Sequence, residues 1–275
     1  MRHAAALLGL LAVLLPGAGQ ALQIKPLKVI AFGDVGVGGS SQRAFGEGVR
    51  RFEASHGADL LLALGDNDYT EDPGAFRANW EASFGWARRS RIGVTGVLGN
   101  HDVRVEGGRY EFPTLKMPGR YYRRRVGPVD FFMLDSNAVD AGQTAWLRRA
   151  LAASRARWKI AAFHHPAFSC GNYQSHPGVV GSWVPLFERF RVKLVLSSHD
   201  HNYQRFAERQ GVRYVLHGGA NPNLYPLKDC PSGYPRRVRG QVEHGFIYLV
   251  IRETRLDGWA VWPDGRRRDH FVIRG

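Results

Sequence analysis

Short runs of consecutive apolar residues recur along the chain, and several are separated by stretches with apolar residues at helical spacing. Runs of this length without polar interruptions are typical of strands that are buried on both faces. They lie at residues 27–32, 59–63, 92–98, 130–134, 158–163 and 193–196. The alternation of such strands with helices predicts an α/β fold.

Helices are predicted where apolar side chains recur every three or four residues. Residues 41–54 and 143–154 carry such stripes, and Phe76, Trp80 and Phe84 follow one another at intervals of four. In the last forty residues the pattern alternates with a period of two residues and is interrupted by Gly-containing turns. This is typical of antiparallel strands. Because no repeat and no linker rich in Pro, Gly and Ser interrupts the pattern, residues 22–275 are predicted to form a single domain.

The first 21 residues have the composition of a targeting segment. Arg2 precedes an apolar stretch at 4–15, and Gly19 and Ala21 form a small-x-small cleavage pattern. This predicts a signal peptide cleaved near Ala21, and therefore export to the periplasm or secretion. The alternative is an uncleaved membrane anchor, although the apolar stretch is too short to span a bilayer.

Charge and cysteine content add two expectations. Lys and Arg number 38 against 24 Asp and Glu, for a net charge of +14. The positive electrostatic field of such a protein attracts phosphorylated substrates, nucleic acid or acidic membranes. The alternative is that the charges only solvate the surface. In an oxidising compartment Cys170 and Cys230, the only cysteines, are expected to form a disulfide; two buried thiols are the alternative.

Polar clusters follow five of the apolar strands directly. Open α/β sheets place their binding sites at the carboxyl ends of strands, so these clusters are expected to converge. The clusters are Gly33-Asp34, Gly65-Asp66, Gly99-Asn100-His101-Asp102, His164-His165-Pro166 and Ser198-His199-Asp200-His201.

The side chains in and beside these clusters offer oxygen and nitrogen donors. They are Asp34, Asp66, Tyr69, Asn100, His101, His164, His199 and His201. Such donors suit Fe, Zn or Mn. They are too many for one cation, which indicates a pair roughly 3.5–4 Å apart that shares a carboxylate. The adjacent His165 is expected to pack or hydrogen-bond without contacting a metal.

In this order the clusters, with Asn67, Asp68 and Tyr69 following Asp66, resemble the motif series of the purple acid phosphatases. These belong to the calcineurin-like metallophosphoesterases, and the resemblance spans residues 28 to about 206. It implies a layered β-sandwich flanked by helices, in the order αββα.

The resemblance also implies roles for the residues. The ferric site would consist of Asp34, Asp66, Tyr69 and His201. The second site, for Fe, Zn or Mn, would consist of Asp66, Asn100, His164 and His199, with Asp66 bridging. His101 would be a catalytic, substrate-facing residue, and His176 resembles a second such histidine of the small animal enzymes.

Tyr69 distinguishes this family from its relatives. Most calcineurin-like phosphodiesterases carry Asp-x-His in the first motif, where this chain has Asp34-Val35-Gly36. A tyrosine three residues after Asp66 fills that vacancy. Ser198 and Phe163 stand where the family often has Gly, and neither change removes a ligand.

The predicted function is hydrolysis of phosphate monoesters by a metal-bound hydroxide, with small phosphorylated molecules as partners. Neither Cys170 nor any serine lies in an activated motif, which argues against a covalent phosphoenzyme. An exported phosphodiesterase or nuclease is the first alternative, because Arg runs such as Arg123-Arg124-Arg125 suit nucleic acid. A non-catalytic polyanion-binding protein is the second. No membrane association is expected once the signal peptide is removed.

Overall fold

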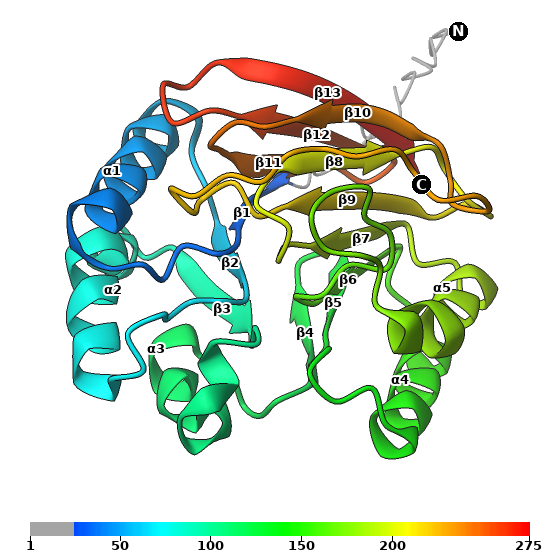
Figure 1. Cartoon of the computed structure of the whole chain (residues 1–275). Coiled ribbons are helices and arrows are strands. Elements are labelled where there is room, and N and C mark those ends of the chain that lie inside the picture. The colour runs from blue at the N-terminus through cyan, green and yellow to red at the C-terminus, as the bar shows by residue number, and fades with distance from the viewer. Residues whose placement is uncertain (1–24) are drawn as a thin grey trace, which may run out of the picture.

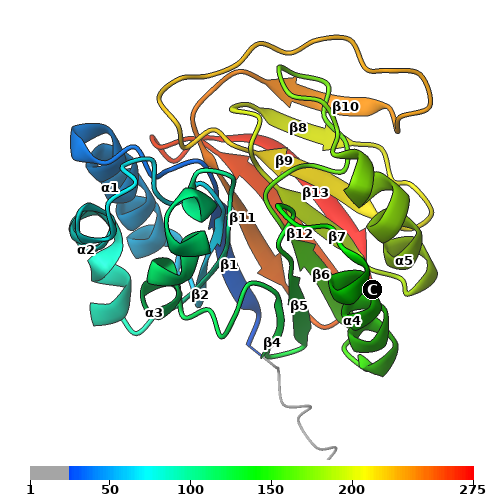
Figure 2. The ribbon, with the colours of Figure 1, turned by 60° about the horizontal axis from the view of Figure 1, so that its bottom comes forward.

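The computed structural model describes residues 25–275, so the predicted signal peptide lies outside the described residues. Two mixed sheets, one of six strands and one of seven, lie in the middle of the molecule. Helices cover the outer side of each sheet, as Figures 1 and 2 show from two directions. The predicted αββα sandwich is therefore confirmed. No helix in the described part of the chain is long and apolar enough to cross a membrane.

The six-stranded sheet joins the N-terminal and C-terminal parts of the chain. Its members are β1 (Leu27–Phe32), β2 (Leu60–Leu64), β3 (Gly93–Val97), β11 (Phe246–Ile251), β12 (Arg255–Val261) and β13 (Arg267–Arg274). They lie in the order β13-β12-β11-β1-β2-β3. Strands β1, β2 and β3 are parallel, and β11, β12 and β13 add to β1 as an antiparallel meander, as the alternating pattern of the tail predicts.

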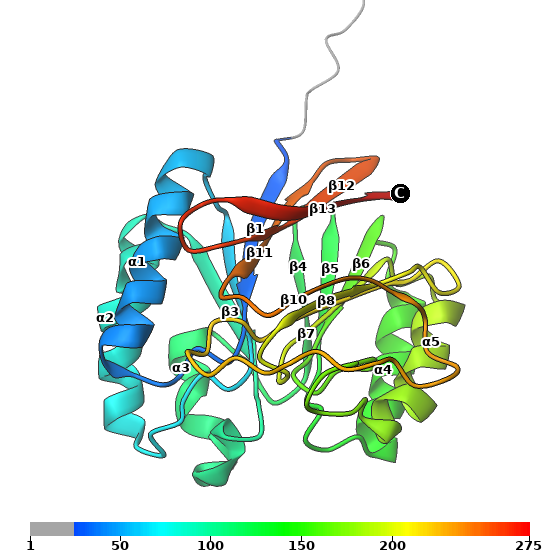
Figure 3. The ribbon, with the colours of Figure 1, turned by 45° about the horizontal axis from the view of Figure 1, so that its top comes forward.

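The seven-stranded sheet is built from the middle of the chain (Figure 3). Its members are β4 (Tyr122–Val126), β5 (Val129–Met133), β6 (Trp158–Ala162), β7 (Leu194–Ser197), β8 (Tyr203–Phe206), β9 (Arg213–His217) and β10 (Arg237–Gln241). They lie in the order β10-β8-β9-β7-β6-β5-β4. Strands β5, β6, β7 and β9 are parallel, so β6 and β7 end at the same edge.

Three helices follow the predicted stripes, namely α1 (Gly39–His56), α2 (Pro73–Arg89) and α4 (Ala141–Ala153). The short helices α3 (Phe112–Leu115) and α5 (Val184–Arg189) were not predicted, nor were the short turns η1 (Asp102–Arg104), η2 (Glu106–Glu111) and η3 (Val179–Trp183). Asp72 caps α2 by accepting hydrogen bonds from the backbone of Gly74 and Ala75, and Asp140 caps α4 in the same way. Helices α1 and α2 lie on the outer side of the six-stranded sheet, and α4 and α5 on that of the other (Figure 1).

Both faces of the seven-stranded sheet are buried, which explains the continuous apolar runs. Along β5 the side chain of Phe131 packs into the core shared with the first sheet, and Phe132 packs into the core under α4 and α5. Along β6, Ile160 packs into the core shared with the first sheet, and Ala161 packs into the core under α4 and α5. Since successive side chains of a strand point to opposite faces, a strand between two cores needs apolar residues throughout.

The expected disulfide is present. Cys170, in the segment after β6, is bonded to Cys230, in the segment between β9 and β10. The bond joins two loops that are 60 residues apart in sequence, and neither cysteine is a free thiol.

Candidate metal centre

Each polar cluster begins within a few residues of the carboxyl end of a parallel strand. Asp34, Asp66 and Asn100 follow β1, β2 and β3 of one sheet, whereas His164 and His199 follow β6 and β7 of the other. The two sheets therefore each bring donors to one place. Asp34, Asp66 and His164 supply atoms that all lie within 4.8 Å of one another.

Three donors form the first group. The Tyr69 hydroxyl lies 3.3 Å from Asp34 Oδ1 and 3.4 Å from His201 Nε2, and these two atoms lie 3.3 Å apart. Nitrogen and oxygen atoms bound to one cation at about 2.0–2.2 Å lie roughly 3–3.5 Å from one another. The triangle therefore has the dimensions of one face of a coordination shell.

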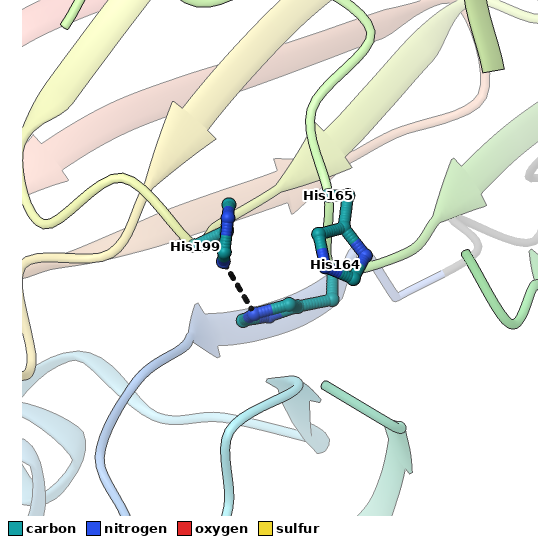
Figure 4. A group of neighbouring side chains, drawn as sticks. All are labelled: His164, His165 and His199. Atoms are coloured by element: carbon teal, nitrogen blue, oxygen red, sulfur yellow. Dashed lines mark hydrogen bonds between the residues drawn. The ribbon is translucent and has the colours of Figure 1, made fainter. Parts of the chain in front are cut away.

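The second group is centred on His164 (Figure 4). Its Nε2 lies 3.1 Å from His199 Nδ1, 3.1 Å from Asn100 Oδ1 and 3.4 Å from Asp66 Oδ1. These contacts are again of the length expected between ligands of one cation. Asp66 lies beside both groups, because its carboxylate also neighbours Tyr69.

The backbone orients two of the imidazoles. His164 Nδ1 lies 3.0 Å from the Leu64 carbonyl oxygen, and His201 Nδ1 lies 2.7 Å from that of Asn223. Because a carbonyl oxygen only accepts, each Nδ1 carries the proton and donates it. Each Nε2 is then directed into its donor group, as in metal-binding histidines. Burial opposes the charge on these two imidazoles, but Asp66 raises the pKa of His164 to about 9 and Asp34 raises that of His201, so a bound cation would take the place of a proton on each Nε2.

Three of the donor residues have left-handed backbone conformations. The φ angles of Asp34, Asp66 and His199 are 63°, 50° and 72°. This region is costly for residues other than Gly, and strained residues of this kind cluster at functional sites. The close approach of the backbone also requires Gly99, where a Cβ atom would lie 2.1 Å from Asp66 Oδ1.

The charges in the group keep the Asp66 carboxylate ionised, the form that binds a cation. Burial opposes the charge on Asp66, but His164 and the backbone N–H of His101 outweigh it and lower the pKa of Asp66. Burial together with the neighbouring His164 and His165 lowers the pKa of His199 to about 2, which leaves this imidazole neutral. Burial and the carboxylates of Asp34 and Asp66 raise the pKa of the Tyr69 phenol well above its usual value.

Other buried acids fix the loops that carry the donors. Asp102 accepts hydrogen bonds from the backbone N–H groups of Asn67 and Gly99, at 2.8 and 2.7 Å. Asp200 accepts from the Ser169 hydroxyl at 2.6 Å and from the backbone of Asn172 at 3.2 Å. These contacts hold in place the loops that orient the donor side chains.

His101, His165 and His176 lie around the donors in different ways. The His101 ring lies 4.2 Å from that of Tyr69 at a tilt of 43°, and the backbone N–H of His101 donates to Asp66 Oδ1. Burial lowers the pKa of His101. The His176 ring lies 5.5 Å from that of His165, with Nδ1 accepting from the backbone of Val179. His176 thus neighbours His165, whereas His101 lies directly beside the predicted ligands.

His165 lies closer to the donors than the sequence indicated. It hydrogen-bonds Ser136 through Nδ1 at 2.9 Å, as expected for a packing residue. Yet it also forms, with His164 and His199, a set whose potential ligand atoms lie within 4.8 Å of one another (Figure 4). The sequence did contain a signal for this position, because His165 directly follows the predicted ligand His164 in the His-His-Pro motif.

A layered αββα sandwich with oxygen and nitrogen donors from both sheets, grouped around one shared aspartate, defines a metal-dependent phosphoesterase of the two-metal class. The chain belongs to the calcineurin-like phosphoesterase family, whose sequence pattern matches residues 27–203.

The chain is similar in sequence and in fold to several acid phosphatases. Tartrate-resistant acid phosphatase type 5 of Rattus norvegicus is 27% identical over 251 residues, covering 76% of this chain and 77% of that protein. Purple acid phosphatase 7 of Arabidopsis thaliana is 28% identical over 198 residues, covering 59% and 60%. The solved structure of purple acid phosphatase PPD1 from Lupinus luteus seeds superposes with a TM-score of 0.77 at 17% identity, over 92% of this chain and 54% of that one.

Proposed function

We propose that this protein is an exported acid phosphatase that hydrolyses phosphate monoesters at a two-metal centre. The observation that carries the proposal is the pair of donor groups meeting at Asp66, with separations that fit two coordination shells. The names of the relatives, tartrate-resistant and purple acid phosphatases, support the same activity.

In this proposal the donors divide into two sites that share Asp66. Asp34, Asp66, Tyr69 and His201 hold Fe(III), and Asp66, Asn100, His164 and His199 hold Fe, Zn or Mn. The metal ions are assigned to the two sites according to the negative charge of the donors in each. The first site collects two carboxylates and a phenol, which together suit a hard trivalent ion, whereas the second has only the shared carboxylate and neutral donors.

The two cations supply a Lewis acid that neutralises the phosphate charge and activates the attacking water. The protein supplies the arrangement around them. In this proposal His101 donates a proton to the leaving oxygen or a hydrogen bond to a phosphoryl oxygen, and its position beside Tyr69 and Asp66 supports that role. His176, whose ring neighbours that of His165, contributes to substrate binding and catalysis, with its proton on Nε2 because Nδ1 accepts from the backbone N–H of Val179.

We further propose that residues 1–21 direct export and that residues 22–275 form the mature domain. The Cys170–Cys230 disulfide supports this, since such bonds persist in oxidising compartments. The partners are small phosphorylated molecules, and nucleic acid is the less favoured alternative.

The test combines metal analysis with two kinds of ester. Purified protein is expected to contain two metal ions per chain and to hydrolyse a simple phosphate monoester well above a dinucleotide. Asp66→Ala should lose metal and activity together, because Asp66 contacts both donor groups. A preference for the dinucleotide would favour the phosphodiesterase reading, and full activity after complete metal removal would overturn the mechanism.

A further inference from the structure

A hollow of about 410 Å³ lies at the opposite end of β3 from the metal centre. Gly93, the first residue of β3, lines the hollow, whereas the donor Asn100 follows the other end of the strand. The two ends of β3 are about 13 Å apart, at roughly 3.3 Å per residue. Because the volume of the hollow is typical of sites for small molecules, the hollow is a candidate for a second, separate binding site.

The hollow combines an apolar floor with a cationic rim. Buried apolar side chains form the floor, namely Trp80, Phe84 and Ile92. Exposed or half-buried cations form the rim, namely Arg88, Arg91, Lys116 and Arg124. Glu81 is the one acid among the described residues of the lining, and its carboxylate is paired with Arg88 at 3.0 Å. The positive charge of the other rim cations is therefore not neutralised within the hollow.

Two of the rim cations occupy backbone positions at which glycine is the usual residue. Arg91 lies two residues after the end of α2 and Lys116 directly follows α3, with φ angles of 58° and 52°. Left-handed residues at helix ends are most often Gly. Cations also stabilise helix C-termini, but α3 is only four residues long and Arg124 comes from the strand β4. Stabilisation of helix ends therefore does not account for the whole rim.

Arg124 is held in place at the edges of both sheets. It belongs to β4, an edge strand of one sheet, and its Nη1 donates to the carbonyl oxygen of Val94 in β3, an edge strand of the other, at 2.9 Å. A guanidinium that is already fixed loses little conformational freedom when an anion binds. Its planar fork also matches the oxygen atoms of acidic groups.

We infer that this hollow is a second ligand site, which binds a small organic anion with its acidic group on the cationic rim and its apolar body on the floor. A bare inorganic anion would leave the floor uncovered, and a neutral apolar molecule would leave the rim cations without a partner. Only a ligand with both parts complements both surfaces. The site is separate from the metal centre, so this inference does not depend on the proposed phosphatase function.

The test is a calorimetric titration of the metal-loaded protein with three probes. Naphthalenesulfonate carries both an acidic group and an apolar body, naphthalenemethanol lacks the charge, and methanesulfonate lacks the apolar body. Naphthalenesulfonate is expected to bind at one site per chain, about tenfold or more tighter than either of the other probes. If it does not bind, or if either of the other probes binds equally well, the inference is wrong. Removal of the metals by a chelator should leave its affinity unchanged, and loss of binding would place the probe at the metal centre instead.

Substitutions in the rim locate the site. Lys116→Gly removes a cation and places at φ 52° the residue that adopts this conformation without strain, so the fold should be retained, as circular dichroism can check. Combined with Arg91→Gln, it should weaken naphthalenesulfonate binding about tenfold.

Arg123→Gln is the matched control for the loss of charge. Arg123 is exposed and precedes Arg124 in β4, so its side chain points to the other face of the strand, and it does not line the hollow. This variant should bind naphthalenesulfonate as the wild type does. Equal weakening by Arg123→Gln and by the rim variant would show that only the net charge of the protein attracts the probe, and an unchanged affinity in the rim variant would also overturn the inference.

Discussion

At the residue scale, the strained backbone of the site separates its residues from ordinary turn formers. Asp34, Asp66 and His199 adopt positive φ angles that cost of order 1–3 kcal/mol each when no glycine is present. Aspartate and histidine both occur in this region more often than most other residues with a Cβ atom. The fold maintains all three conformations, and the side chains of the same three residues lie in the donor groups. The strain is therefore best understood as the cost of directing these side chains into the donor groups.

Substitution of His101 tests its assignment as a catalytic residue that is not a ligand. His101→Ala should retain both metals, since the His101 ring packs beside Tyr69 and the hydrogen bond to Asp66 comes from the His101 backbone. The rate should fall about 10²- to 10⁴-fold, as for a lost general acid. Measured over esters of graded leaving-group pKa, the loss should be smallest for the best leaving groups. An equal loss for every ester would assign His101 to substrate binding instead.

Substitution of Tyr69 tests the ferric assignment. A phenolate bound to Fe(III) absorbs visible light, so protein loaded with iron is expected to be pink to purple. Tyr69→Phe removes only the hydroxyl that lies 3.3 Å from Asp34 and should abolish the absorption band while leaving the fold intact. Circular dichroism provides the control for folding. A colourless wild type with two iron ions per chain would show that Tyr69 does not bind the metal.

Much of this site is predictable from sequence because its residues follow strands in fixed order. The position of each cluster after an apolar run is enough to bring Asp34, Asp66, Asn100, His164 and His199 together. Other features depend on tertiary contacts that have no local pattern. The Asn223 carbonyl orients His201, and Tyr225 stacks on it, yet both come from an irregular loop distant in sequence.

At the element scale, the strand predictions succeeded where both faces of a strand are buried. The runs of β1, β2, β5 and β6 are continuous and apolar because cores lie on both sides. Strands β4 and β8 were not predicted. β4 is an edge strand with the sequence Tyr-Arg-Arg-Arg-Val and alternating exposure, and β8 is four residues long. Short or charged strands form through pairing with neighbours, which a local pattern does not record.

A polar contact joins the two sheets. Asp269 of β13 accepts two hydrogen bonds from Arg205 of β8, at 2.6 and 3.0 Å, and a third from the Tyr203 hydroxyl at 2.7 Å. The carboxylate is 8% exposed and the guanidinium 14%. Because β13 and β8 belong to different sheets, this contact stabilises their packing against each other.

Asp269→Asn should therefore destabilise the protein by about 3 kcal/mol at pH 7, as for one lost partner of a buried ion pair. Burial opposes the charge, but Arg205 and Tyr203 lower the pKa of Asp269. A lowered folded-state pKa gives stability that is present above the unfolded value of about 3.9 and is lost as pH falls. The unfolding temperature of the variant should lie well below that of the wild type at pH 7, and the difference should be smaller at pH 3.

The control for this comparison is Asp264→Asn, which removes an exposed ion pair with Arg266. Surface pairs of this kind contribute little, so its unfolding temperature should match the wild type at both pH values. If the difference in unfolding temperature between Asp269→Asn and the wild type does not change with pH, the packing of the Asp269 side chain, and not its charge, holds β13 to β8.

At the scale of the whole molecule, the metal centre lies across the boundary between the two sheets. Asp34, Asp66 and Asn100 come from the six-stranded sheet, and His164, His199 and His201 come from the other. Global unfolding separates these segments and destroys both donor groups at once. Cations that bind only the folded chain therefore link the stability of the two sheets to site occupancy.

Metal loading should accordingly raise the unfolding temperature markedly. A cation at a thousand times its dissociation constant adds about 4 kcal/mol, and each kcal/mol corresponds to roughly 2–4 °C for a chain of this size. Loaded protein should thus unfold roughly 10 °C above chelator-treated protein in calorimetry, with the disulfide intact in both. Asp66→Ala should lose most of this shift because both groups contain Asp66, whereas Asp264→Asn should keep it. Equal unfolding temperatures for loaded and metal-free protein, with two ions per chain confirmed, would show that the ions bind the unfolded chain as tightly as the folded one and do not link the two sheets.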